Sequence, residues 1–99
     1  MNKSHVLTAT VSFNTPSDKT RAEESARALG MVLRGMQAIK ASLLLADGLS
    51  NDKMVFHIFS KETQFPLGDM LASFKEELME RFGEAEGKVF LNKWVFEKK

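Results

Sequence analysis

The chain has 99 residues, of which 43% are hydrophobic and 27% are charged, a composition typical of one globular domain spanning residues 1–99. It contains no cysteine, which excludes disulfides, thiolate metal sites and cysteine nucleophiles and fits a reducing compartment. The net charge of +1 favours no particular class of partner. No stretch approaches the ~20 apolar residues of a membrane-spanning helix, and MNKSHVLTATVSFN lacks the apolar core of an export signal, so we expect a cytoplasmic protein without membrane contacts.

The N-terminal third predicts a strand followed by a helix. In HVLTATVSF, residues 5–13, apolar and hydroxyl side chains alternate, which predicts a strand with one buried face. Thr15 and Pro16 are typical of a helix start, and apolar residues then recur every three or four positions. We expect this helix to end near Gly35, because a glycine inside a helix costs about 1 kcal/mol relative to alanine.

The segment QAIKASLLLADGLS, residues 37–50, fits two interpretations. Its alanines and leucines favour a continuation of the first helix, with Gly48 as a terminator. That helix would have about thirty residues and a length of about 45 Å, which is too long for a compact domain of this size. We therefore predict a strand over residues 39–46, and the long helix remains the alternative.

The C-terminal half predicts a strand, a helix and a last strand. KMVFHIFS, residues 53–60, is rich in β-branched and aromatic residues and predicts a strand. A helix starts at Pro66, carries apolar residues at helical spacing, and is expected to end at Gly83 and Gly87. The segment KVFLNKWVFEKK then predicts a strand over residues 88–97.

This last strand is apolar on both of its faces. Because a buried lysine is costly, Lys93 favours the other face for the core. The face expected to point inward carries Phe90, Trp94 and Phe96. The face expected to point outward carries Val89, Leu91, Lys93 and Val95.

The predicted order of strand, helix, strand, strand, helix, strand indicates an α+β domain of the ferredoxin-like βαββαβ plan. This plan is a two-layer sandwich with an antiparallel sheet and two helices on one face, in which the first and last strands are neighbours. The alternative with the long first helix would be a βαβαβ domain. The plan hosts many unrelated functions, so the architecture alone predicts none of them.

The sheet face that the helices leave uncovered is the most informative feature. Such a face should be polar where it meets water, and Thr8, Thr10 and Ser12 satisfy this. The other strands carry more apolar side chains than two helices can cover, so we expect a protein partner, most simply a second copy in a homodimer. The candidate contact residues are Leu44, His57, Phe59, Val89, Leu91, Lys93, Trp94 and Val95.

No catalytic motif, phosphate loop, metal-ligand spacing or cofactor fingerprint is present, so we expect no enzyme activity, no metal and no cofactor. The prediction is a small interaction module, a regulator or inhibitor that binds another protein. Single-stranded nucleic acid bound by aromatics and lysines on the sheet is one alternative, disfavoured because residues 5–13 offer threonines where RNA-binding sheets place aromatics. A small-ligand sensor or enzyme with a pocket around His57 is the other alternative.

Overall fold

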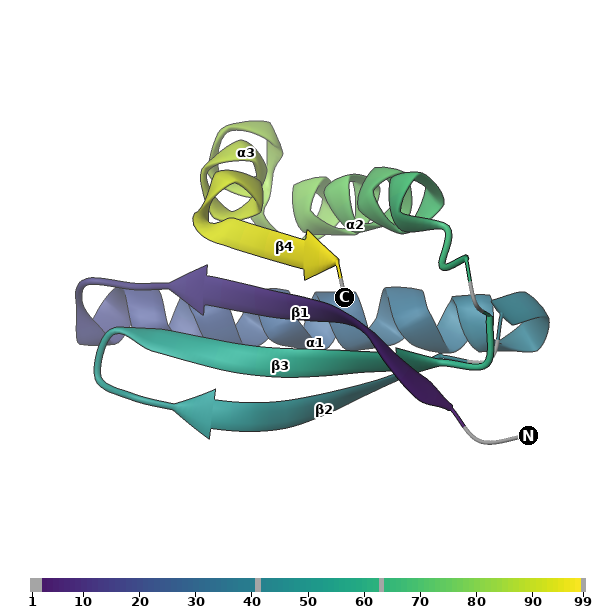
Figure 1. Cartoon of the computed structure of the whole chain (residues 1–99). Coiled ribbons are helices and arrows are strands. Elements are labelled where there is room, and N and C mark those ends of the chain that lie inside the picture. Colours follow the sequence, from purple (N-terminus) through teal and green to yellow (C-terminus); the bar gives the residue numbers. More distant parts are fainter. Residues whose placement is uncertain (1–2, 41, 63, 99) are drawn as a thin grey trace.

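The computed structural model describes residues 3–40, 42–62 and 64–98, and it describes the side chains of all of these except residues 37–40 and 42. Seven elements follow one another along the chain (Figure 1). They are β1 (Ser4–Ser12), α1 (Pro16–Lys40), β2 (Ser42–Leu49), β3 (Lys53–Ser60), α2 (Leu67–Phe82), α3 (Glu84–Lys93) and β4 (Trp94–Lys98). The domain is therefore α+β, with a four-stranded antiparallel sheet and three helices in the described ranges.

The strands lie in the order β2-β3-β1-β4, so β1 and β3 are central and β2 and β4 form the edges. β1 pairs with β3 on one side and with β4 on the other, as predicted for the first and last strands. Within the described ranges, no helix is long and apolar enough to cross a membrane.

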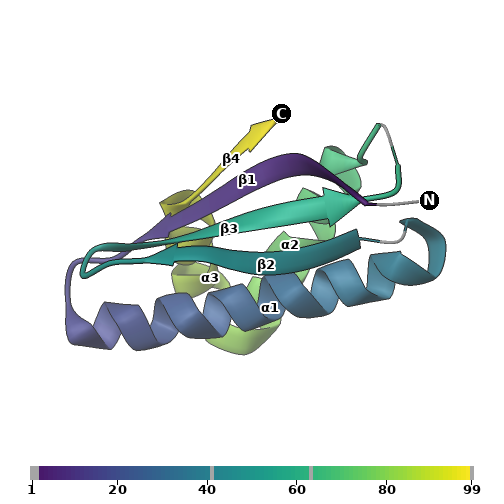
Figure 2. The ribbon, with the colours of Figure 1, turned by 60° about the horizontal axis from the view of Figure 1, so that its bottom comes forward.

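All three helices lie on the same face of the sheet, with α1 beneath β2 and β3 (Figure 2). The principal-axis extents of 40 × 27 × 17 Å match two layers, because packed layers are separated by about 10 Å. The core fills the space between these layers. Its largest fully buried side chains include Leu7 and Val11 from β1, Ile58 from β3, Leu29 and Leu33 from α1, and Met70, Phe74 and Leu78 from α2.

The sequence signals for β1 and for the start of α1 are confirmed. Leu7, Ala9 and Val11 are buried at alternate positions of β1, as the period of two predicted. At the start of α1, the backbone N–H of Asp18 donates a hydrogen bond of 3.1 Å to Thr15 Oγ1, which caps the helix as predicted.

The prediction that Gly35 ends the first helix is wrong. α1 continues to Lys40, because the burial of Leu33 and the packing of Met36 against the core outweigh the unfavourable helix propensity of glycine. At 1.5 Å per residue its 25 residues span about 37 Å, which fits the 40 Å long axis. The alternative βαβαβ order is also wrong, because β2 follows α1 as a separate strand. β2 begins at Ser42 rather than 39 and ends at Leu49 rather than 46, and residue 41 lies outside the described residues.

The prediction of a strand over residues 88–97 is wrong for most of that segment. Residues 88–93 belong to the helix α3, and only Trp94–Lys98 is a strand. The same residues fit a helical period, since Gly87, Phe90 and Trp94 recur at spacings of three and four and are all buried. The described ranges therefore contain three helices instead of the expected two. The third, α3, occupies the second half of the connection from β3 to β4.

Two glycines shape the turn between α2 and α3. Gly83 ends α2 as predicted, with a φ of 85° that favours glycine. The prediction that Gly87 also ends a helix is wrong, because Gly87 lies inside α3 where that helix meets α2. A Cβ on Gly87 would stand 3.1 Å from the backbone N and Cα of Met79, so any larger residue would require the two helices to shift apart.

Candidate interaction surface

The sheet face opposite the helices is uncovered, and we call it the open sheet face. It is formed by Leu43 and Leu45 from β2, Val55, His57 and Phe59 from β3, His5, Thr8 and Thr10 from β1, and Val95 and Glu97 from β4. Within it, the cross-strand register places Thr8 between His57 on one side and Glu97 on the other. A second row places Thr10 between Val55 and Val95.

A bulge in β1 brings His5 to this face. Strict alternation would place His5 with Leu7 on the core side, but the pairing of β1 with β3 shifts register between these two residues. His5 therefore stacks on His57, with ring centroids 4.1 Å apart and planes inclined by 19°. The ring of Phe59 lies 5.3 Å from that of His5, so three rings from two neighbouring strands form a cluster.

A second bulge brings a carboxylate to the same cluster. The pairing of β2 with β3 shifts register between Ala46 and Gly48, which leaves Asp47 as the extra residue. Asp47 Oδ2 lies 3.0 Å from His57 Nε2. Neither His5 nor Asp47 was among the predicted contact residues. Gly48 was a signal, because a glycine inside a strand often marks a bulge, but the strand was predicted to end at residue 46.

Apolar side chains flank this polar centre on both edges of the sheet. Leu43 and Leu45 on β2 are 38% and 48% exposed, and Val95 on β4 is 54% exposed. Val55 and Phe59 between them are half-buried. The open sheet face thus has hydroxyl, imidazole and apolar groups on its two central strands, two leucines on the β2 edge, and Val95 beside Glu97 on the β4 edge.

The predicted contact residues divide between three places in the fold. His57, Phe59 and Val95 lie together on the open sheet face. Leu44 and Trp94 lie on the opposite, helix-covered face, where Trp94 is 5% exposed and Leu44 packs against the core. The remaining three, Val89, Leu91 and Lys93, lie on α3 rather than on a strand.

These placements bear out the inward orientation of the aromatic residues and part of the outward one. Phe90 and Trp94 are buried, and Phe96 packs against the core. Val95 points outward as predicted, whereas Leu91 packs against the core. Val89 is also exposed, but on a helix.

Lys93 lies at the end of α3 and avoids the core. Its Nζ is 3.4 Å from Asp18 Oδ2 and stands 5.3 Å from the centre of the Phe90 ring. It therefore ties α3 to the first turn of α1 in this structure.

The rings on the sheet divide between its two faces, which bears on the alternative of nucleic-acid stacking. Phe56 packs against the core and its ring centroid is 5.8 Å from that of Trp94. On the open sheet face, His5, His57 and Phe59 form the cluster described above.

Two hollows are lined by described residues, and the first of them borders the open sheet face at His5. A cleft of about 760 Å³ at one end of the sheet is lined by residues that include His5, Ser60, Lys61 and Lys98, but not His57. A smaller apolar hollow of about 390 Å³ lies between α2, α3 and β4, beside Trp94 and Phe96. Among the side chains that the structure describes, no three of His, Asp and Glu gather in a way that would hold a metal ion.

Comparisons of the chain with models of protein families, with curated proteins and with solved structures found no match.

Proposed function

We propose that this protein is a small non-enzymatic interaction module, a regulator or inhibitor, that pairs with a second copy of itself through the open sheet face. We further infer that the protein is cytoplasmic. Its fold is then a variant of the ferredoxin-like plan that has a third helix before the last strand. The strand order β2-β3-β1-β4 and the position of all helices on one face support this assignment.

The observation that carries the proposal is the exposure of Leu43, Leu45 and Val95 on one face of a two-layer domain. Burial of an aliphatic side chain of this size stabilises by roughly 1.5–3 kcal/mol when it is complete, and these side chains are half-exposed. A partner that covers them together would gain several kcal/mol from apolar contacts alone.

The size of the face is consistent with a weak homodimer. Strands about 4.8 Å apart that rise about 3.3 Å per residue give four strands of up to eight residues a flat area of up to about 500 Å². Two copies would then bury about 1,000 Å² in total, at the lower limit for specific interfaces. We therefore expect dissociation constants in the micromolar range rather than a permanent dimer.

The chemistry of the face suits contact with an identical copy. A two-fold interface requires a surface that is complementary to itself. The hydroxyls of Thr8 and Thr10 both donate and accept hydrogen bonds, so they can pair with the same groups of another copy. Aliphatic side chains such as Leu45 and Val95 pack against one another without directional demands.

Sedimentation velocity on the full chain between about 1 and 200 µM tests the proposal, and we expect the weight-average mass to rise from that of a monomer to that of a dimer. Val95→Lys places a charge on the open sheet face and should raise the dissociation constant at least tenfold. Val89→Lys is the matched control, because Val89 is 52% exposed but lies on α3, and it should leave the constant unchanged. A monomer at every concentration, or equal effects of the two variants, would refute the proposal.

A further inference from the structure

The stacked histidines are the chemically unusual part of the open sheet face. They are the chain's two histidines, and they meet from neighbouring strands with ring centroids 4.1 Å apart. Histidine is the side chain whose charge ordinarily changes between about pH 5 and 8. Both histidines of the chain therefore lie together, within the surface that we assign to self-association.

The two imidazoles have different partners. His57 Nε2 lies 3.0 Å from Asp47 Oδ2, so a proton on His57 is balanced by a carboxylate. His5 Nε2 lies 3.0 Å from the carbonyl oxygen of Leu7 and 3.1 Å from Thr8 Oγ1, both of which are neutral. Among the ion pairs of the described residues, His5 takes part in none.

The titratable groups of the open sheet face at this site are His5 from β1, Asp47 from β2, His57 from β3 and Glu97 from β4, which stands opposite Thr8. Lys61, Glu62 and Lys98 line the cleft that borders His5. Carboxylic acids ordinarily stay ionised above about pH 5.

A dimer interface over the two stacked imidazoles would disfavour a second proton on this pair. An imidazolium on His57 would form an ion pair with Asp47. An imidazolium on His5 beside it would lie against a like charge, and His5 forms no ion pair among the described residues. Water screens this repulsion on the free monomer, but a partner that covers the stack would remove the water and leave a buried unpaired charge.

We propose that protonation of the His5–His57 stack opposes dimerisation, so that the protein associates near pH 8 and separates as the pH falls to 5.5. This inference rests on the proposed function. Its sign follows from linkage: if the dimer binds fewer protons than two monomers, the association constant rises with pH. If about one proton is excluded per copy, we expect the dissociation constant to rise at least about tenfold between pH 8 and 5.5.

Sedimentation velocity on the full chain at pH 8.0, 7.0, 6.2 and 5.5, at constant ionic strength, tests this inference. His5→Phe keeps an aromatic ring beside His57 but removes the second cation, and it should reduce the change in the dissociation constant to less than threefold. Glu97→Gln is the control, because it alters the same face but retains both imidazoles and should keep the full pH dependence. Should His5→Phe fail to fold, as judged by the fluorescence of Trp94, His5→Gln takes its place.

The outcomes separate the two proposals. A wild-type protein that is monomeric at every pH contradicts the proposed function itself. A wild-type dimer whose dissociation constant is the same at pH 8.0 and 5.5 overturns only the pH inference, as does a His5 variant that retains the full pH dependence.

Discussion

At the scale of single residues, the core contains a polar pair whose members depend on each other. Trp94 Nε1 donates a hydrogen bond of 3.0 Å to Ser25 Oγ, and Ser25 Oγ donates one of 2.6 Å to the carbonyl oxygen of Ala22. Ser25 and Trp94 are 0% and 5% exposed. The indole N–H therefore has a partner inside the protein and cannot exchange it for water.

Replacing this serine tests that dependence. Ser25→Ala leaves the indole N–H of Trp94 buried and unpaired, and we expect the free energy of unfolding to fall by about 1–3 kcal/mol. Urea denaturation followed by the fluorescence of Trp94, the chain's one tryptophan, measures the change. Ser73→Ala, at an exposed position of α2, should change stability by less than about 0.5 kcal/mol, and an equal effect of both variants would contradict this account.

At the scale of elements, the junction of α2 and α3 depends on a missing side chain. Gly87→Ala would place a Cβ 3.1 Å from the backbone of Met79, which cannot move without displacing α2. We expect a loss of about 1–3 kcal/mol in urea unfolding, typical of overpacking. Gly68→Ala is the matched control, because nothing lies within 4 Å of that position and alanine favours the helix, so it should be neutral or slightly stabilising.

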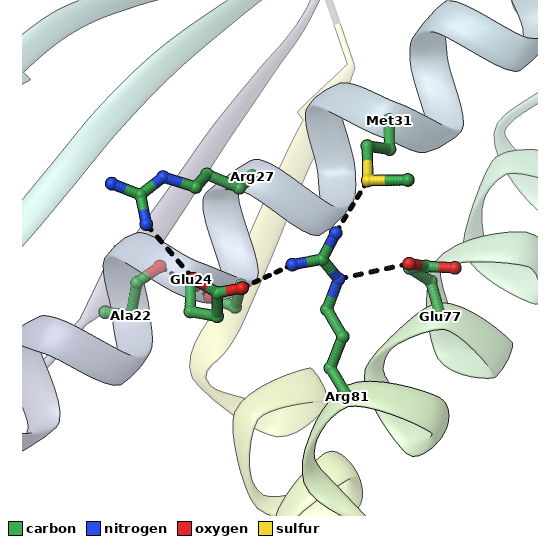
Figure 3. A network of polar contacts seen from close by, with 7 residues as sticks. Ala22, Glu24, Arg27, Met31, Glu77 and Arg81 are labelled. Atoms are coloured by element: carbon green, nitrogen blue, oxygen red, sulfur yellow. Dashed lines mark hydrogen bonds and ion pairs between the residues drawn. The ribbon is translucent and has the colours of Figure 1, made fainter.

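The contact between α1 and α2 includes a charged network centred on Arg81 (Figure 3). Its guanidinium forms an ion pair with Glu24 of α1 and, at 3.1 Å, with Glu77 of α2, and it also contacts Met31. The side chain of Arg81 is 21% exposed, and Glu24 is 38% exposed, so water weakens the pairs without abolishing them. The network therefore joins the two helices at their surface rather than in the core.

Removing the central charge should weaken this junction in a salt-dependent way. We expect Arg81→Gln to lower the free energy of unfolding by about 1 kcal/mol at low ionic strength and by less in 1 M salt, because ions screen partly exposed pairs. Arg27→Gln removes a side chain that is 73% exposed and pairs only within α1, and it should have almost no effect. Urea unfolding at both salt concentrations measures this, and a loss that does not depend on salt would assign the role of Arg81 to packing instead.

At the scale of the whole molecule, stability and association should be linked. A partner that binds only the folded chain stabilises it by mass action, so the melting temperature should rise by several degrees between about 1 and 100 µM protein. Differential scanning calorimetry at pH 8 measures this, and Val95→Lys should abolish the rise while Val89→Lys retains it. A melting temperature independent of concentration in the wild type would contradict self-association.

Much of this fold was accessible from local patterns. The alternation in β1, the cap at Thr15 and the glycine at position 83 each act within a few residues, and the structure confirms them. The candidate surface was accessible only in part. His57, Phe59 and Val95 follow from strand alternation, and the same alternation places Trp94 on the helix-covered face. The face of Leu44 depends on the pairing of β2 with β3, which directs this residue towards the helices.

The sequence by itself determined where the chain alternates with a period of two, where α1 and α2 begin, and that the sheet carries apolar side chains on both faces, since these depend on neighbouring residues. Only the tertiary structure decided three other features. Residues 88–93 fit strand and helix periods equally, and the close contact of Gly87 with α2 selects the helix. Two bulges, which arise from pairing between distant strands, bring His5 and Asp47 beside His57. α1 extends past Gly35 because burial of side chains in the core outweighs the local propensity of glycine.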